Sequence, residues 1–122
     1  MGRPKARVLV VEDDSALLRG LVDVLVYNGY EVKGVEDGGQ GLKAGVNEAS
    51  DLLLLDVMLL TLDGFSICKE IRKKKPAQGI IMITAKGAED DIVTGFNAGA
   101  DDYISKPFTL REVMVRIEAV LR

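Results

Sequence analysis

Acidic side chains stand at two places in this sequence where apolar runs end. Glu12 and Asp13 follow the apolar run 8–11. Asp56 follows four consecutive leucines. A carboxylate in such a setting is costly unless a cation or hydrogen bonds compensate it. Clustered acids also repel one another and raise each other's pKa values, so this pattern predicts a cation between them.

Two more polar side chains stand where other apolar runs end. Thr84 ends the run 79–84, and Lys106 comes shortly after the run 102–104. A hard divalent ion such as Mg²⁺ takes carboxylates together with waters and a phosphate. Carboxylates can also accept a phosphoryl group as an aspartyl phosphate, which needs in-line positioning and positive charge around the phosphate oxygens. We therefore interpret Asp56 as a phosphoryl acceptor, with charge from Mg²⁺ and Lys106 and a hydrogen bond from Thr84.

Simpler interpretations exist for the same residues. Read alone, the acidic segment 12–14 is equally typical of a solvated helix start, where negative charge is favoured. Asp56 read alone would also suit the cap of the turn that follows it. On spacing alone, Tyr103 is more typical of an ordinary residue in an amphipathic strand than of a functional residue. The acids together with Lys106 favour the phosphoryl site over these alternatives.

The composition excludes several kinds of site. Histidine is absent, which removes Ser–His and Cys–His hydrolysis, histidine-ligated metals and histidine acid–base chemistry. The single cysteine, Cys68, cannot form an internal disulfide, so a cytoplasmic location is expected. We interpret Cys68 as a small core residue.

Length and charge limit the class of protein further. A chain of 122 residues suffices for one domain with a core, and its apolar runs are far too short to span a membrane. The net charge is −3, and the one basic run, 72–75, suits the end of a helix. We expect no membrane contact and no direct nucleic-acid contact by this domain.

Short apolar runs alternate with helical patterns along the whole chain. The runs predict strands at 7–11, 30–35, 51–56, 79–84 and 102–104. The intervening patterns predict helices at 15–27, 38–48, 65–74, 90–98 and 110–121. Ser15 is the expected N-cap of the first helix, and Leu110 is expected on the buried face of the last. Five strands alternating with five helices indicate a doubly wound α/β domain, in which ligands bind at the carboxyl ends of parallel strands.

The residues at these positions resemble the receiver domain of two-component response regulators. The matching segments occur in the family's order at 8–14, 55–58, 63–65, 83–85, 99–103 and 106–108. The resemblance covers nearly the whole chain, so 1–122 is identified as one receiver domain. It implies a flavodoxin-like α/β fold, a five-stranded parallel sheet in the order 2-1-3-4-5 with five helices.

The resemblance also implies the chemistry of the site. Asp56 would accept a phosphoryl group from a histidine on a partner kinase. Asp13, Asp56 and the backbone carbonyl of Met58 would bind Mg²⁺ directly, and Glu12 would contact the ion through water. The domain would therefore be a phosphorylation-activated signalling switch and not an enzyme.

Other residues match the part of the family that responds to phosphorylation. Thr84 and Tyr103 resemble the switch pair, whose side chains reorient when phosphate is present. Lys106 resembles the lysine that pairs with the phosphoryl group, and the Lys106–Pro107 bond is expected to be cis. The output would be a shift in the face formed by the fourth helix, the fifth strand and the fifth helix.

The last helix, 108–122, is similar to that of the OmpR-type winged-helix class. Members of that class continue into a DNA-binding domain, so the chain is expected to be an excised receiver or a natural single-domain regulator. Leu60 stands where the family usually has proline, which predicts a more mobile or differently shaped loop at 57–63.

Two further departures concern dimerisation. The OmpR-type dimer pairs a basic residue on the fourth helix with the acid at Glu112, but Ile92 holds that basic position. Glu118 occupies another place that is often basic. Asp102 and Arg116 remain able to pair. We expect at most a weak or altered homodimer.

Two other functions compete with the switch. An aspartate-nucleophile phosphatase of the haloacid-dehalogenase kind needs a second Asp two residues after the nucleophile, and that position is Met58. Met58 also lacks a group to orient a hydrolytic water, which predicts slow self-dephosphorylation. A degenerate receiver that serves only as an interaction module is disfavoured because the acids, Thr84 and Lys106 are all retained.

Overall fold

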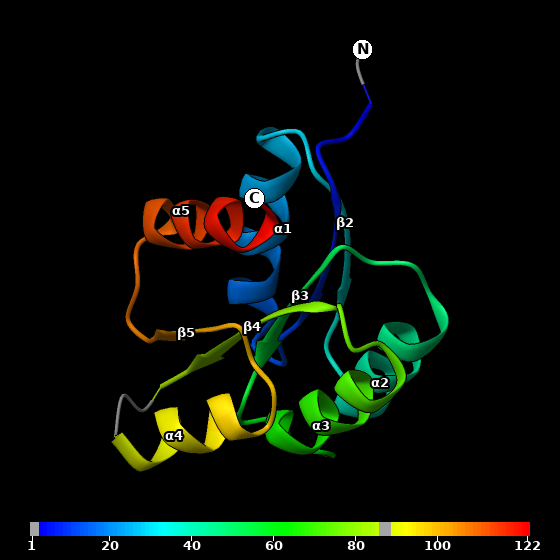
Figure 1. The fold of residues 1–122 in the computed structure, drawn as a ribbon. Coiled ribbons are helices and arrows are strands. Elements are labelled where there is room, and N and C mark those ends of the chain that lie inside the picture. The colour runs from blue at the N-terminus through cyan, green and yellow to red at the C-terminus, as the bar shows by residue number, and fades with distance from the viewer. Residues whose placement is uncertain (1–2, 86–88) are drawn as a thin grey trace.

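Five parallel strands form the centre of the molecule, with helices on both faces (Figure 1). The computed structural model describes residues 3–85 and 89–122. The strands are β1 (Arg7–Val11), β2 (Glu31–Val35), β3 (Leu52–Asp56), β4 (Gly79–Thr84) and β5 (Asp102–Ser105). Their order across the sheet is β2-β1-β3-β4-β5, which confirms the expected topology.

The helices divide between the two faces of the sheet. They are α1 (Ser15–Tyr27), α2 (Gly38–Asn47), α3 (Gly64–Lys74), α4 (Glu89–Asn97) and α5 (Leu110–Leu121). Helices α1 and α5 pack on one face, and α2, α3 and α4 lie on the other (Figure 1). Within the described residues, none of these helices has the length and apolar character needed to cross a membrane.

Every predicted element is present, with ends within one residue of the prediction. Two details were wrong. The N-cap of α1 is Asp14 and not Ser15, since the Asp14 carboxylate accepts a hydrogen bond of 3.1 Å from the backbone N–H of Leu17. Leu110 is 42% exposed, whereas Val113 and Ile117 form the buried face of α5.

Strand β3 lies in the middle of the sheet and is buried along its whole length. Its leucines alternate between the two faces, so Leu53 and Leu55 pack with one set of helices and Leu52 and Leu54 with the other. Burying one leucine side chain contributes about 2 kcal/mol. The unbroken leucine run is therefore what a central parallel strand requires.

Helix α2 forms despite its glycines, because they allow close packing. A Cβ at Gly41 would lie 2.7 Å from Cγ1 of Val11 on β1. A Cβ at Gly45 would collide with the side chain of Ile71 on α3. The low helix propensity of glycine is thus offset by close packing on both neighbours.

The side chain of Arg72, near the end of α3, joins three segments. It donates hydrogen bonds to the backbone carbonyl oxygens of Pro76 and Gly99, the first at 2.8 Å, and pairs with the Asp101 carboxylate at 3.1 Å. Asp101 in turn accepts a hydrogen bond of 2.8 Å from the backbone N–H of Ile80. Arg72 was predicted only as part of a solvated basic run, but it also fixes the turn between α4 and β5.

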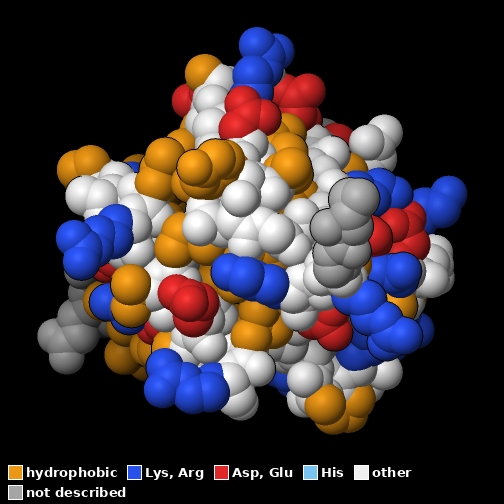
Figure 2. Space-filling model, turned by 90° about the horizontal axis from the view of Figure 1, so that it is seen from above, with side chains coloured by type: hydrophobic (Ala, Val, Ile, Leu, Met, Phe, Trp, Pro, Cys, Tyr) orange, Lys and Arg blue, Asp and Glu red, His pale blue; other side chains and the backbone are white. Residues whose placement is uncertain are grey.

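Charges of both signs are spread over the surface, in keeping with the net charge of −3. Figure 2 shows the face seen from above in Figure 1, where Lys and Arg side chains lie among Asp and Glu side chains and apolar groups. Opposite charges are therefore interspersed on this face.

Cys68 on α3 is completely buried, and its thiol lies 3.5 Å from the backbone carbonyl oxygen of Ala98. Burial raises the pKa of this thiol to about 11. Because the thiolate is the reactive form, we expect alkylation of the native protein at pH 8 to be at least roughly 100-fold slower than in the urea-unfolded chain. Iodoacetamide labelling followed by mass spectrometry measures this ratio, and equal rates in the two states would contradict it.

Candidate functional site

The residues predicted at strand ends come together at the carboxyl edge of the sheet. Glu12 directly follows β1 and Asp56 ends β3, its neighbour in the sheet. Thr84 ends β4, the next strand along. Lys106 follows β5, and its backbone N–H donates a hydrogen bond of 2.6 Å to the carbonyl oxygen of Thr84. The parallel sheet thus gathers residues from four separate parts of the chain at one edge.

Three carboxylates form a cluster at this edge. Each of Glu12, Asp13 and Asp56 offers an oxygen within 4.8 Å of the others. Glu12 is 2% exposed and Asp56 is 3% exposed, while Asp13 is partly exposed. The cluster is therefore open to ligands on the side of Asp13 and closed by protein behind the other two acids.

The Lys106 ammonium group faces this cluster. Its Nζ lies 3.1 Å from Oε1 of Glu12 and 3.5 Å from Oδ2 of Asp56. Partial burial acts to lower the pKa of Lys106, but the two acids outweigh it and raise that pKa above its usual value. Lys106 therefore stays charged at neutral pH.

Two of the acids have pKa values above their usual range. Burial raises the pKa of Glu12, and the neighbouring Asp56 carboxylate raises it further. The pKa of Asp13 is also raised, by burial first and then by the charge of Glu12. Three carboxylates thus face one ammonium group, which leaves negative charge uncompensated.

The two carboxylate oxygens of Glu12 have different surroundings. Its Oε2 accepts a hydrogen bond of 3.1 Å from the backbone N–H of Asp14. Its Oε1 is buried and, within the described residues, has no hydrogen bond of regular geometry, although the Lys106 ammonium is near. A buried, unsatisfied carboxylate oxygen beside two further acids fits the oxygen-rich surroundings that Mg²⁺ prefers.

Met58 stands at the open side of the site. Its backbone N–H donates a hydrogen bond of 3.2 Å to Oδ1 of Asp56, while its side chain is 58% exposed. The backbone of Met58 is therefore next to the Asp56 carboxylate, and its thioether is exposed to solvent.

The loop that contains Leu60 is held at both ends. The Thr61 hydroxyl donates a hydrogen bond of 2.8 Å to the Asp37 carboxylate, and the backbone N–H of Gly64 donates one of 2.8 Å to the Val57 carbonyl oxygen. Leu60 itself is 92% exposed and does not contribute to the core. Leucine at this position is therefore not held by the core, and the expected change in the mobility or shape of the loop stays a prediction.

The predicted switch pair is buried in this structure. Thr84 is 1% exposed and Tyr103 is 8% exposed. Tyr103 lies opposite Met82 of the neighbouring strand and belongs to the same apolar cluster. The two side chains thus occupy inward positions on adjacent strands. The bond between Lys106 and Pro107 is cis, as expected.

Charged and apolar side chains share the face formed by α4, β5 and α5. Arg116 pairs within the chain with Asp102 at 3.0 Å and with Glu112 at 3.2 Å. The same partners, Asp102 first, raise the pKa of Arg116. Val93 is 51% exposed and Phe96 is 46% exposed on α4. Arg116 and Asp102, which were expected to pair in a dimer, contact each other here within one molecule, and the dimer contact stays a prediction.

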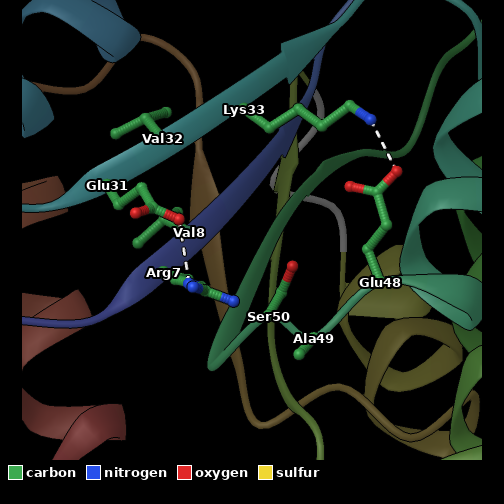
Figure 3. Close-up of a pocket in the computed structure, with 8 residues that line it drawn as sticks. All are labelled: Arg7, Val8, Glu31, Val32, Lys33, Glu48, Ala49 and Ser50. Atoms are coloured by element: carbon green, nitrogen blue, oxygen red, sulfur yellow. Dashed lines mark hydrogen bonds and ion pairs between the residues drawn. The ribbon is translucent and has the colours of Figure 1, made fainter.

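A second hollow lies at the amino ends of β1 and β2 (Figure 3). Its charged side chains pair with one another, Arg7 with Glu31 at 2.9 Å and Lys33 with Glu48 at 2.6 Å. The lining charges are thus already neutralised, and the hollow lacks the uncompensated charge of the acidic cluster.

Sequence comparisons show which family this chain resembles. A model of the response regulator receiver domain matches residues 8–118. The chain is 45% identical over 116 residues to the alkaline phosphatase synthesis transcriptional regulatory protein PhoP of Bacillus subtilis. It is 44% identical over 118 residues to the transcriptional regulatory protein ResD of the same organism. These matches cover 95% and 97% of this chain but 48% and 49% of the relatives, so the chain spans about half of their length.

Solved structures show the same fold. A CheY-like response regulator receiver domain protein from Methanospirillum hungatei superposes with a TM-score of 0.91 at 33% identity, covering 98% of this chain and 94% of the other. DrrB of Thermotoga maritima, described as an OmpR/PhoB homologue, superposes with a TM-score of 0.87 at 32% identity, covering 94% of this chain and 52% of the other. The doubly wound fold and the resemblance to OmpR-type proteins are thereby confirmed.

Proposed function

The chain belongs to the family of response regulator receiver domains, and from this premise we propose that it accepts a phosphoryl group on Asp56 from the histidine of a partner kinase. The observation that carries the proposal is the placement of Asp56 at the end of the central strand, 3% exposed and 3.5 Å from the Lys106 ammonium. A nearby cation and an open side suit an acceptor carboxylate.

In the proposed transfer, an oxygen of Asp56 attacks phosphorus in line with the donor. The O–P bond forms as the P–N bond of the donor histidine breaks, and the released imidazole keeps the bonding electron pair and takes up a proton from solvent. Lys106 stabilises the charge on the phosphoryl oxygens, and the Thr84 hydroxyl donates a hydrogen bond to one of them. The absence of histidine from this chain fits a donor on another protein.

We propose that Mg²⁺ occupies the acidic cluster, held by Asp13, Asp56 and the Met58 carbonyl, with Glu12 in contact through water. The ion supplies positive charge near the transferred phosphoryl group. The unsatisfied oxygen of Glu12 and the raised pKa values of Glu12 and Asp13 support this assignment. An interaction module without this chemistry would not need the ion.

Mg²⁺ is expected to stabilise the folded protein. At ten times its dissociation constant, the ion should add about 1.4 kcal/mol to the free energy of unfolding, because it relieves repulsion among carboxylates that are separated in the unfolded chain. Urea unfolding with and without MgCl₂ measures the gain. The Asp13→Asn variant should show much less of it, and an equal gain in both proteins would contradict the site.

The phosphorylated form is expected to last for minutes or longer after the phosphodonor is removed. Met58 is exposed at the entrance of the site but has no polar group to orient a hydrolytic water. Intact-mass spectrometry after treatment with acetyl phosphate and Mg²⁺ follows the loss of the phosphoryl group. Met58→Asn, which introduces an amide there, should shorten the lifetime several-fold. A lifetime of seconds in the parent would support the phosphatase interpretation instead.

The proposed output is a change in the face formed by α4, β5 and α5. Phosphate near Thr84 draws its hydroxyl inward and favours the buried position of Tyr103, which shifts a pre-existing equilibrium of that face. We propose at most a weak homodimer there, since Ile92 and Glu118 do not supply the basic partners of the OmpR-type dimer. We further propose a cytoplasmic domain that acts, without contacting nucleic acid itself, as the input part of a transcription regulator.

A further inference from the structure

Gly95 stands inside helix α4, where glycine is a poor choice. Glycine lowers helix stability relative to alanine because it has more backbone freedom to lose. Gly95 lies in the last turn of α4, but its backbone φ angle is not positive, so it is not the left-handed residue that follows the helix, which is Gly99. Gly95 is buried, and a Cβ added to it would face Tyr103 of β5, the strand that α4 contacts. The reason for glycine should therefore be sought in packing.

The ring of Tyr103 occupies the space that a side chain at this position would take. A Cβ on Gly95 would lie 3.0 Å from both Cδ2 and Cε2 of Tyr103, and 3.6 Å from Sδ of Met82. Carbon atoms in contact are usually about 3.5–4.0 Å apart. The bare backbone of α4 at Gly95 is thus one wall of the position that the Tyr103 ring fills.

The Tyr103 ring also belongs to an apolar cluster that includes residues of β4. Met82 lies opposite Tyr103 in the sheet, and both belong to one apolar cluster with Ala98. Tyr103 is 8% exposed in this position. A methyl group at residue 95 would crowd the Tyr103 ring, which relieves the crowding by moving away from α4 toward solvent.

We propose that Gly95 is a positioning residue for Tyr103, because it leaves open the space that the ring needs in its buried position. A side chain at residue 95 shifts the ring toward solvent. The biological meaning of this inference rests on the proposed function, in which the buried position of the Tyr103 ring accompanies phosphorylation. Gly95 then affects how readily the α4–β5–α5 face reaches its phosphorylated arrangement.

The chain offers both a clean probe and a matched control. It contains no tryptophan and three tyrosines, so a Tyr27→Phe, Tyr30→Phe background makes Tyr103 the only intrinsic fluorophore of that kind. Gly20 lies inside α1, and a Cβ added to its backbone would have no atom within 4 Å, so Gly20→Ala adds the same methyl group without a neighbour.

The first test is acrylamide quenching of Tyr103 fluorescence in this background, without a phosphodonor. Gly95→Ala is expected to raise the quenching constant at least twofold, and Gly20→Ala to leave it unchanged. Unchanged quenching in Gly95→Ala would overturn the inference. So would an equal rise in both variants, which would mean general loosening.

The second test is a double-mutant cycle of urea unfolding with Tyr103→Ala. In the Tyr103→Ala background, Gly95→Ala should lower the urea midpoint less, or raise it more, than it does in the parent. Equal shifts would overturn the inference. If Gly95→Ala does not fold, recovery of folding in the double variant supports the inference, and failure of both variants overturns it.

These results are separable from the proposed function. Labelling of Asp56 by acetyl phosphate in the parent tests the function, whereas the quenching and unfolding experiments need no phosphate. An unlabelled parent with raised quenching in Gly95→Ala would reject the switch and retain the role of Gly95. A labelled parent with unchanged quenching in Gly95→Ala would support the phosphorylation switch and reject the role of Gly95.

Discussion

Asp56→Asn is expected to abolish labelling of the protein by acetyl phosphate in the presence of Mg²⁺. The amide has nearly the shape of the carboxylate, but it lacks the negative charge and the nucleophilic oxygen that attack phosphorus. The Lys106 ammonium, 3.5 Å from Asp56, would remain in place but would have no phosphoryl group to stabilise. Intact-mass spectrometry, or transfer of radiolabel from a labelled donor, measures the loss, which should exceed 100-fold by order of magnitude.

Asp51→Asn is the matched control for this experiment. Asp51 directly precedes the same strand at its other end, where its carboxylate accepts a hydrogen bond of 2.8 Å from the backbone N–H of Arg7. Asp51 lies far from the acidic cluster, so the Asp51→Asn variant should be phosphorylated to the same extent as the parent. Circular dichroism shows whether both variants are folded. Undiminished labelling of folded Asp56→Asn would reject Asp56 as the acceptor.

Gly64→Ala is expected to lower the free energy of unfolding by about 3 kcal/mol. Gly64 is the first residue of α3 and packs directly on the end of β3. A Cβ there would lie 2.7 Å from Cα of Val57 and would collide with the backbone carbonyl oxygen of Asp56. Both obstacles are backbone atoms, so no rotamer change relieves them. The shift required would also displace the acceptor residue, so labelling should fall as well.

Gly20→Ala again provides the comparison, because a Cβ at Gly20 has no neighbour within 4 Å. Its helical position should make alanine neutral, or stabilising by up to about 1 kcal/mol. Urea unfolding of the two variants beside the parent gives both values. Equal midpoints for Gly64→Ala and the parent would contradict the prediction, because they would show that the backbone after β3 can move to accept the added methyl group at little cost.

The acidic site was predictable because its residues mark the ends of locally recognisable elements. Runs such as the leucines of β3 and the apolar periods of the helices are properties of neighbouring residues, and each predicted element is present within one residue of its expected ends. In a parallel sheet the carboxyl ends of all strands share one edge. Asp56, Thr84 and Lys106 therefore had to approach one another once the strands were recognised.

Other features had no local signal. The sequence predicts Ser15 as the cap of α1, but Asp14 is the cap, since either residue type can cap a helix and only the backbone geometry distinguishes them. Leu110 matches the apolar period of α5 but is 42% exposed, although Val113 in the same turn is buried. Local patterns show which residues can be buried, whereas the path of the helix over the sheet sets which of them are.

Contacts between distant segments were the least visible. Arg72 meets Gly99 and Asp101, and the space above Gly95 is filled by Tyr103 from another element. Read along the chain, Arg72 is one of several basic residues and Gly95 a weak point in a helix. Their roles arise only when α3, α4 and β5 are packed together, because hydrogen bonding and steric exclusion act over a few ångströms in space, whatever the separation along the chain.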